Sequence, residues 1–442
     1  MTSINTNSLT SNSLASSNLS LELLERISSL RNEPLWLLQK RKKAFDAFLN
    51  LDIPQMKYGI TILFSLHNLN LESLDFTDDY QPVLFETIHQ DQQAVIMDLH
   101  SALKHIHYSE IIKKHLFSTL DDNNAEWLKF DSLHCGFFNR GIFVYIPKNA
   151  AIKQLINLDF STLNKTQLDH TLIVAEEGSS AVIVLGAKIN KHITNHQQNT
   201  KNYQELKTNY VEVFLKNNAQ LNIIKTQNYN EHVYHFEQNN TVVEADSKIN
   251  WHVSTLGSLH TKSDTVVKLK GKGSSSTIHA LFLGNNVQRF DLNAAAIHQA
   301  EHTRSTIIAK GVVKDRAKAL FKGLIDIKEH AKYSEGSQKE DALLLSNSAE
   351  ADAIPKLLVA NNDVKCSHSA SIGQVDKERL FYMMSRGLVE QKAKHMIVEG
   401  FFSDLLELLP DEELKNQLKE IVHTQIIEGC TEECKEYCDQ DC

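Results

Sequence analysis

Apolar and polar residues alternate along the middle of the chain, over residues 136–375. Short apolar runs such as Tyr210–Leu215 are separated by turns rich in Asn, Asp, Gly and Ser, a texture that is typical of β-strands. The turn-to-strand transitions at Leu221, Ile249 and Thr277 lie 28 residues apart. A solenoid rung built from a few short strands has about this length. The pattern therefore predicts a β-solenoid over residues 136–375, and a β-sandwich with coincidental spacing is the alternative.

Apolar residues recur at helical spacing before this region. The spacing predicts an N-terminal helical region over residues 21–135, because i, i+3 and i+4 positions are repeatedly apolar. Pro34 suits the start of a helix, where its missing N–H has no helical partner. The helices predicted here are Leu21–Leu30, Pro34–Leu49 and Asp91–Leu120.

A C-terminal helical domain is predicted over residues 376–427. Asp376 suits the N-cap of its first helix, and Gly387 suits the end of that helix. Apolar stripes on these helices either pack against the same chain or form a docking surface for a partner. The helices predicted here are Lys377–Arg386, Val389–Leu409 with an interruption at Gly400, and Glu412–Ile427.

Composition and charge narrow the function classes. The chain has 442 residues and a net charge of −9, which argues against nucleic-acid binding because phosphate neutralisation needs clustered Lys and Arg. No apolar run approaches the roughly 18–20 residues of a membrane-spanning helix. Residues 1–20 are rich in Ser, Asn and Thr and are predicted to be a disordered leader. We expect a cytoplasmic protein that binds neither nucleic acid nor membrane, with a plastid protein as the minor alternative.

Four of the six cysteines crowd into a tail over residues 428–442. Their spacing of four would place neighbouring thiols along one face of a helix, where they could chelate a soft metal. The spacing matches no CxxC zinc or ferredoxin pattern. A metal- or cluster-binding tail and a functionally incidental tail both remain open. The cysteines concerned are Cys430, Cys434, Cys438 and Cys442.

The segment Cys366-Ser367-His368 carries a second candidate site. Residues i and i+2 of a strand point to the same side, so the thiol and the imidazole would stand next to each other. Both groups bind iron or zinc, but two ligands do not complete a four-coordinate site. The alternative is a buried Cys beside a hydrogen-bonded His. His298 and His302, four residues apart, form a weaker candidate metal pair.

A block from residue 302 to residue 401 resembles the SufB/SufD family of iron–sulfur cluster assembly scaffolds. Its motifs occur in the family's order, and only the leader and the Cys-rich tail fall outside the resemblance. The motifs include Lys310-Gly311-Val312-Val313, Leu343-Leu344-Leu345-Ser346, Asp363-Val364-Lys365-Cys366-Ser367-His368, Leu380-Phe381-Tyr382 with Ser385-Arg386-Gly387, and Gly400-Phe401.

The resemblance implies a mainly β protein, a right-handed parallel β-helix between helical ends. It further implies a complex of a SufB-like paralogue, a SufD-like paralogue and a SufC-like ABC ATPase, so that this chain would be a scaffold and not an enzyme. The paralogue would pair with the C-terminal part of the β-helix, and the ATPase would dock on the C-terminal helices. The docking residues carried over from the motifs are Phe381, Tyr382, Arg386, Gly387, Gly400 and Phe401.

Within the family, the residues favour the SufD type. The SufB type carries a catalytic Cys just before the equivalent of Leu343, and here Glu340 or its neighbours occupy that place. The resemblance implies that His368 binds iron or a nascent cluster, with Cys366 as a second candidate ligand. It leaves open a flavin in the assembled complex and a homodimer of the isolated chain. The competing interpretation is a β-solenoid metallochaperone that acts through the Cys-rich tail.

Overall fold

The computed structural model describes most of the chain. The described residues are 19–53, 56–58, 61–64, 66, 69–71, 94–120, 128–159, 166–186 and 204–427. Most of the leader, residues 1–18, and the Cys-rich tail over residues 428–442 lie outside these ranges, so the predictions made for them stay predictions.

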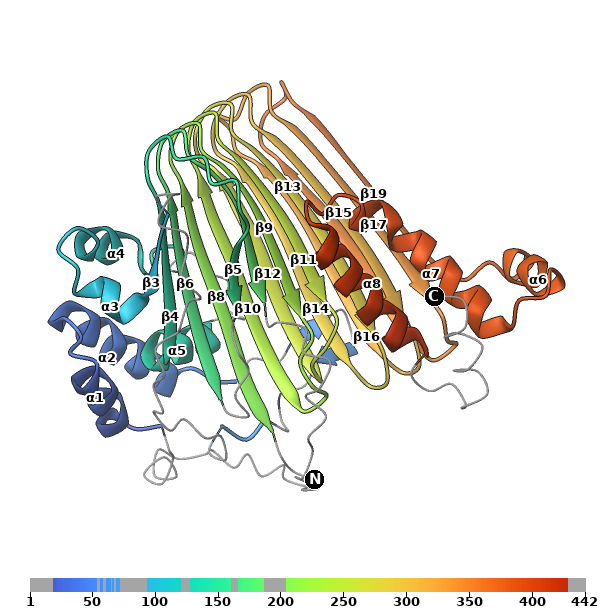
Figure 1. Ribbon diagram of the computed structural model, residues 1–442, viewed down its shortest axis with the longest axis horizontal. Helices are drawn as coiled ribbons and strands as arrows, with labels where there is room; N and C mark the ends of the chain where they lie inside the picture. The colour runs from blue at the N-terminus through green and yellow to red at the C-terminus, as the bar shows by residue number, and fades with distance from the viewer. Residues whose placement is uncertain are drawn as a thin grey trace, which may run out of the picture.

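Two parallel sheets face each other and form the body of the molecule (Figure 1). Within the described residues, the order of the nine-stranded sheet is β18-β16-β14-β12-β10-β8-β6-β4-β3 and that of the eight-stranded sheet is β19-β17-β15-β13-β11-β9-β7-β5. The strands of the nine-stranded sheet are β3 (Val95–Asp98), β4 (Arg140–Ile146), β6 (Gln167–Ala175), β8 (Glu205–Leu215), β10 (Val233–Val243), β12 (His260–Leu269), β14 (Arg289–His298), β16 (Lys318–Ile327) and β18 (Glu350–Val359).

From β4 onward, successive strands of the chain alternate between the two sheets, so each turn of the chain adds one strand to each sheet. This is a parallel β-solenoid, which confirms the predicted fold class, while its right-handedness stays a prediction. The strands of the eight-stranded sheet are β5 (Ile156–Asp159), β7 (Ser180–Gly186), β9 (Gln220–Gln227), β11 (Lys248–Thr255), β13 (Ser275–Gly284), β15 (Arg304–Val313), β17 (Glu335–Leu344) and β19 (Lys365–Gln374). A short antiparallel ribbon joins β1 (Met56–Tyr58) and β2 (Thr61–Phe64).

The predicted 28-residue repeat is correct for one step and wrong by one residue for the next. Ile249 lies opposite Leu221, as the spacing requires. Thr277, however, lies opposite Asn250 and not opposite Ile249. A slip of one residue turns a side chain to the other face of a strand. The observed register keeps the buried Trp251 beside the buried Ile278 inside the solenoid, and turns of unequal length absorb the difference.

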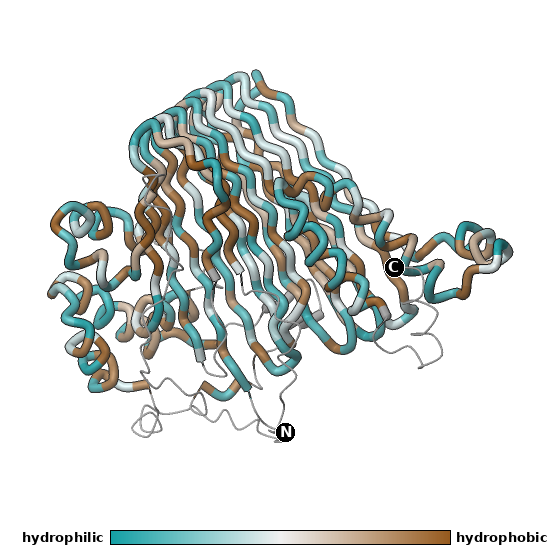
Figure 2. The backbone as a smooth tube through the Cα atoms, viewed as in Figure 1, coloured by the Kyte–Doolittle hydropathy of each residue, from teal (hydrophilic) through white to brown (hydrophobic). Residues whose placement is uncertain are grey.

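Three apolar cores hold these layers together. The interior core lies between the two sheets and is built from alternate residues of successive strands. The N-terminal outer core lies between the nine-stranded sheet and helices α1–α5. The C-terminal outer core lies between the eight-stranded sheet and helices α7 and α8. Figure 2 shows the resulting alternation of apolar and polar positions along the strands.

The N-terminal helices pack on one end of the solenoid (Figure 1). The predicted helices at Leu21–Leu30 and Pro34–Leu49 are confirmed as α1 and α2, but the helix predicted over Asp91–Leu120 is wrong in part. Its β-branched start, Val95–Asp98, is strand β3, which pairs antiparallel with β4. Asp98 then caps α3 by accepting a hydrogen bond from the Ser101 N–H. The helices are α1 (Leu21–Leu30), α2 (Leu35–Asn50), α3 (Leu99–Leu103), α4 (Ser109–His115) and α5 (Leu128–Phe137).

Three C-terminal helices follow the solenoid. The side chain of Asp376 caps the first of them, and Gly387 follows its end with a φ of +97°, a conformation that favours glycine. The interruption predicted at Gly400 is wrong, because α7 continues through this position. A glycine on an exposed helix surface costs only about 1 kcal/mol, too little to break a helix that packs on a sheet. The helices are α6 (Lys377–Ser385), α7 (Glu390–Leu406) and α8 (Glu412–Ile427).

Candidate functional site

The two ends of the solenoid differ in how far their last strands are covered. At the N-terminal end, β4 is buried over almost its whole length, because β3 pairs with it and the helices pack on its outer face. At the C-terminal end, β18 and β19 are the last strands of their sheets within the described residues, and most of their side chains are exposed. The apolar side chains among them include Leu358, Val359 and Ile372. We call this uncovered pair of strands the open end.

Cys366 and His368 both lie in β19, at the open end. Cys366 lies opposite Gly336 of β17 and packs against the interior core, so it points into the space between the sheets. His368 lies two residues further along, on the same side of the strand, and is exposed. Burial raises the pKa of the Cys366 thiol, which keeps it protonated at neutral pH. The imidazole is therefore the more accessible ligand of the two.

Two polar side chains lie one rung deeper, on the inward face of β17. Gln338 lies opposite His368, and Glu340 lies opposite Ala370. Gln338 is 3% exposed and Glu340 is 2% exposed. Within the described part of the chain, neither the Gln338 carboxamide nor either oxygen of Glu340 has a hydrogen-bond partner. A Cβ added at Gly323 of β16 would overlap the ends of both side chains, so both reach across the interior to the opposite sheet.

Burial raises the pKa of Glu340 to about 7, because a charged carboxylate loses its hydration between the sheets. The sequence alone predicts no ligand role for this residue. The available signal was the alternation of β17, which places Gln338 and Glu340 at positions where a solenoid requires inward, apolar residues. The open end thus carries imidazole, thiol, carboxylate and carboxamide groups on one side of two neighbouring strands.

These groups form an incomplete ligand set. No cluster of three or more His, Cys, Asp or Glu side chains within metal-binding distance occurs among the residues that the structure describes. A four-coordinate metal site at the open end therefore needs ligands from another chain or from inorganic partners. The other histidine pair offers nothing comparable. Both ring nitrogens of His298 are bonded to hydroxyl groups, of Thr303 at 2.7 Å and of Ser305 at 2.8 Å, and His302 stacks on Tyr333.

Helix α6 extends away from the sheets beyond the open end (Figure 1). None of its residues is buried, although two of them are large and aromatic. Phe381 is 74% exposed and Tyr382 is 58% exposed. The Arg386 guanidinium lies over the Tyr382 ring and donates a hydrogen bond to its hydroxyl at 3.2 Å. Together with Gly387, which ends the helix, these residues form an aromatic arm.

Gly400 and Phe401, which were predicted to belong to the same docking surface, lie in α7. Phe401 is partly buried against the C-terminal outer core. The Lys310 ammonium of β15 donates a hydrogen bond to its carbonyl at 2.8 Å and lies over its ring. Lys310 also pairs with Asp404 at 2.5 Å. These contacts fix α7 to the eight-stranded sheet, so the structure separates Phe401 from the exposed aromatic arm.

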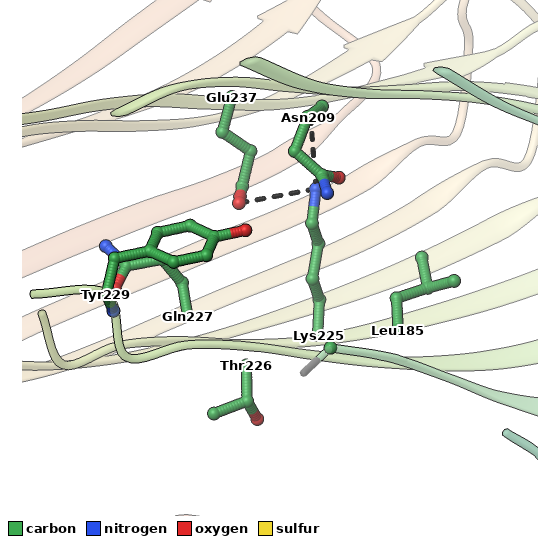
Figure 3. Close-up of a pocket in the computed structure, with 8 residues that line it drawn as sticks. Leu185, Asn209, Lys225, Thr226, Gln227, Tyr229 and Glu237 are labelled. Carbon is green, nitrogen blue, oxygen red and sulfur yellow. Dashed lines mark hydrogen bonds and ion pairs between the residues drawn. The ribbon is translucent and has the colours of Figure 1, made fainter. Parts of the chain in front are cut away.

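A buried charged cluster inside the solenoid lines a small cavity (Figure 3). The Lys225 ammonium lies 3.3 Å from a Glu237 oxygen and donates a hydrogen bond to Asn239 at 2.7 Å. Burial has the largest single effect and raises the pKa of Glu237, but Lys225 and the other neighbouring donors together outweigh burial and lower the pKa of this carboxyl. The cavity leaves about 10 Å³ for the centres of water-sized molecules, room for one water. Because its charged groups already have partners, we interpret the cluster as structural.

A second buried network joins the N-terminal helices to the nine-stranded sheet. His134 of α5 lies 3.1 Å from His170 of β6, which lies 3.1 Å from the Glu212 carboxylate of β8. Glu212 also accepts hydrogen bonds from the backbone N–H and the hydroxyl of Thr119, at 2.8 Å and 2.7 Å. Burial holds the pKa of His134 well below its ordinary value. Sequence reasoning missed this network, because its members are far apart along the chain.

The fold and the site define a class: a parallel β-solenoid with helical ends whose open end carries side chains of the kinds that bind metals. Comparison with known proteins then identifies the family. Residues 159–401 match the family described as SUF system FeS cluster assembly, SufBD core domain, and the chain belongs to it. The match runs from the first complete rungs through β19 and into α7.

Curated relatives extend the similarity over most of the chain. The iron–sulfur cluster assembly protein SufB of Bacillus subtilis is 26% identical, over 89% of this chain and 90% of that protein. An iron–sulfur cluster assembly SufBD family protein of Staphylococcus saprophyticus is 28% identical, over 88% of this chain and 89% of that protein. This assignment to iron–sulfur cluster assembly does not favour the metallochaperone interpretation. Among the described residues, no helix has the length and apolar character needed to cross a membrane.

Proposed function

We propose that this chain is a SufD-type, non-ATPase scaffold subunit of a SufB–SufC–SufD complex that helps to build or transfer nascent iron–sulfur clusters. The residues of β17 and β19 support the SufD type. Glu340 or one of its neighbours stands where a SufB-type scaffold would carry a thiol, and Cys366-Ser367-His368 resembles the SufD pattern. In this proposal the chain catalyses no reaction itself, and the ATPase activity belongs to the SufC-like partner.

The observation that carries the proposal is the position of His368. It is an exposed imidazole on β19, the last strand of the eight-stranded sheet within the described residues, on the side that faces the solenoid interior. A SufB-like chain that pairs with the open end would bring its thiolate to the same place. The nascent cluster, or its iron, is then the cargo shared between His368 and the partner's thiolate. Neutral imidazole is the form that binds metal, so assembly would weaken in acid.

The open end also suits the partner contact. Edge strands present unpaired N–H and C=O groups, and here they are accompanied by exposed apolar side chains. The same surface would support a homodimer when the chain is isolated. We place the complex in the cytoplasm, and a flavin would be held by the complex and not by this chain alone.

The aromatic arm is the proposed docking site of the SufC-like ATPase. Large exposed aromatic side chains with a neighbouring Arg are typical of binding hot spots. Helices α7 and α8 link the arm to the eight-stranded sheet through Lys310 and through Gln425, which donates a hydrogen bond to the Leu256 carbonyl. ATP-driven association of two ATPase subunits would therefore pull on the sheet that ends in β19.

Replacement of His368 tests the proposed function. In the complex reconstituted with SufB-like and SufC-like partners, His368→Ala should abolish cluster formation, measured anaerobically by absorbance and iron and sulfide content. Size-exclusion chromatography should show an intact complex. His330→Ala, in an exposed turn, is the matched control. Normal cluster yield in the His368 variant would disprove the assignment.

Deletion of residues 428–442 separates the proposal from the metallochaperone interpretation. We expect the shortened chain to support normal cluster formation, because the proposed ligands lie in β19. Loss of cluster formation on deletion, with His368→Ala still active, would instead assign the function to the Cys-rich tail.

A further inference from the structure

Glu340 and Gln338 are the least explained side chains of the open end. Both are more than nine-tenths buried, and neither has a hydrogen-bond partner among the described residues. By contrast, other buried carboxylates of the solenoid have cationic partners. Glu237 lies beside Lys225, and Asp291 lies 3.1 Å from Lys262. A buried carboxylate without a partner, such as that of Glu340, is therefore not a general feature of the solenoid interior.

A buried carboxylate without a partner lowers the stability of the fold. Its desolvation cost is offset only by a proton, a cation or hydrogen-bond donors. An apolar residue of similar volume would pack at this position without that cost. Local features that reduce stability without compensation are expected at functional sites. The arrangement around Glu340 thus indicates a ligand that is absent from the isolated chain.

The register places Glu340 and His368 on the same, inward face of neighbouring strands. Glu340 is diagonal to His368 across the parallel β17–β19 pair, and its carboxylate reaches across the interior to Gly323. The neighbouring positions are small. Ala370 lies opposite Glu340, and Gly323 leaves room for the carboxylate on the other sheet. Two of the positions that flank the Glu340 side chain therefore carry nothing larger than a methyl group.

The chemical types of the side chains at the open end indicate which metal ion they would bind. Imidazole with carboxylate is a common protein donor set for ferrous iron, and a carboxamide oxygen adds a further hard donor. We propose that Glu340 and His368 bind Fe²⁺ at the open end, with the Gln338 carboxamide oxygen directed at the same ion. The ion would stay there until a partner chain supplies a thiolate. This inference rests on the proposed function, because it takes the ion to be iron destined for a cluster.

Binding of Fe²⁺ to the isolated, full-length chain tests the inference. The probe is a ferrous salt titrated anaerobically by calorimetry at pH 7.5. Loss even of an outer partner of a metal ligand typically costs about tenfold to a hundredfold in affinity. Glu340→Gln keeps the side-chain shape and should weaken Fe²⁺ binding at least about tenfold. Asp341→Asn is the matched control, because Asp341 points outward and pairs with Lys339 at 3.0 Å; its affinity should not change.

Two further measurements keep the test independent of folding. Glu340→Gln should unfold at the same temperature as the parent chain or higher, because a neutral amide is easier to bury. Gly323→Ala leaves the carboxylate in the chain but places a methyl group where its oxygen lies, and should also weaken Fe²⁺ binding. Parental affinity in Glu340→Gln would overturn the inference and identify Glu340 as a carboxyl group that is simply protonated.

The outcomes also separate this inference from the proposed function. If His368→Ala abolishes cluster formation while Glu340→Gln binds Fe²⁺ normally, the proposed function stands and the inference fails. If Glu340→Gln loses Fe²⁺ while the His368→Ala complex forms clusters normally, iron binding by the carboxylate stands and the assignment of His368 fails.

Discussion

The N-terminal and C-terminal ends of this solenoid solve the same physical problem in opposite ways. Every solenoid has two terminal rungs, each with unpaired sheet edges and an uncovered interior. At the N-terminal end, β3, five helices and a buried hydrogen-bond network cover β4. At the C-terminal end, β18 and β19 remain exposed, and Gln338 and Glu340 in the rung below have no hydrogen-bond partner among the described residues. The first end stabilises the fold, and the second end is the surface where we propose that another chain binds.

The largest expected effect comes from breaking the covered end. Glu212→Ala removes the acceptor of the Thr119 hydrogen bonds and of the His170 contact, leaving buried donors unpaired. We expect a loss of about 3–5 kcal/mol in the free energy of unfolding. Urea titration measures it. The control Glu177→Ala removes only an exposed pair with Lys148 and should cost at most about 1 kcal/mol. Similar small losses in both variants would contradict the role given to the network.

The second-largest effect is expected from acid, which should lower the free energy of unfolding through buried histidines of the nine-stranded sheet. Burial lowers the pKa of His298, His235 and His260 to about 4, from about 6.5 in the unfolded chain. Between these values the unfolded chain takes up protons that the folded chain excludes. Their stabilising contribution is therefore complete above pH 6.5 and lost as the pH falls toward 4, on the order of 1–3 kcal/mol per group.

Urea titrations at pH 7.5, 6.0 and 5.0 measure this dependence. His298→Gln should flatten the dependence of unfolding free energy on pH, whereas His330→Gln, in an exposed turn, should leave the slope unchanged. An unfolding free energy that stays constant from pH 7.5 to 5.0 would show that these histidines are not excluded from protonation by folding.

The aromatic arm should show the reverse behaviour, a change in binding without a change in stability. Phe381→Ala with Tyr382→Ala should weaken binding of the SufC-like ATPase by about 2 kcal/mol, the size typical of a hot spot. Because no residue of α6 is buried, the unfolding free energy should change by less than about 0.5 kcal/mol. Surface plasmon resonance measures binding, and Leu30→Ala, an exposed apolar residue of α1, is the control. Unchanged affinity would remove the arm as the docking site.

The smallest effect on stability is expected at the open edge itself. Ile372→Asp places a charge on β19 at a position that is already 39% exposed, so stability should stay within about 0.5 kcal/mol of the parent chain. Binding of the SufB-like partner should weaken by about 1–2 kcal/mol, because an inward charge opposes edge pairing. Val287→Asp, exposed in a turn, is the control. Equal binding by both variants would place the partner elsewhere.

Local patterns predicted much of this architecture. Asp376 as a cap, Gly387 as a stop and the helix at Leu21–Leu30 are each determined by a few neighbouring residues, and the structure confirms them. The wrong predictions concern segments whose structure depends on contacts with distant parts of the chain. Val95–Asp98 forms a strand because it pairs with the edge of β4. Gly400 is helical because α7 packs on the eight-stranded sheet.

The sequence predicted only those candidate ligands that lie on β19, Cys366 and His368. The i, i+2 relation of Cys366 and His368 can be derived from strand geometry alone. The position of Glu340 beneath them depends on the register of β17 against β19, and the 27-residue step at Thr277 shows how a repeat drifts by one residue. The burial that orphans this carboxylate is a property of the stacked rungs, which no single segment of the sequence contains.

Hydrogen–deuterium exchange on the two terminal strands tests the comparison most directly. In the monomeric chain, the amides of β4 should exchange slowly and those of β19 fast, because only the former lie in a covered edge. On assembly with the SufB-like partner, residues 366–374 should become strongly protected, and the exchange of β4 should not change. Equal exchange of β19 in the free and assembled chain would contradict the claim that the open end is where the partner and the cluster are bound.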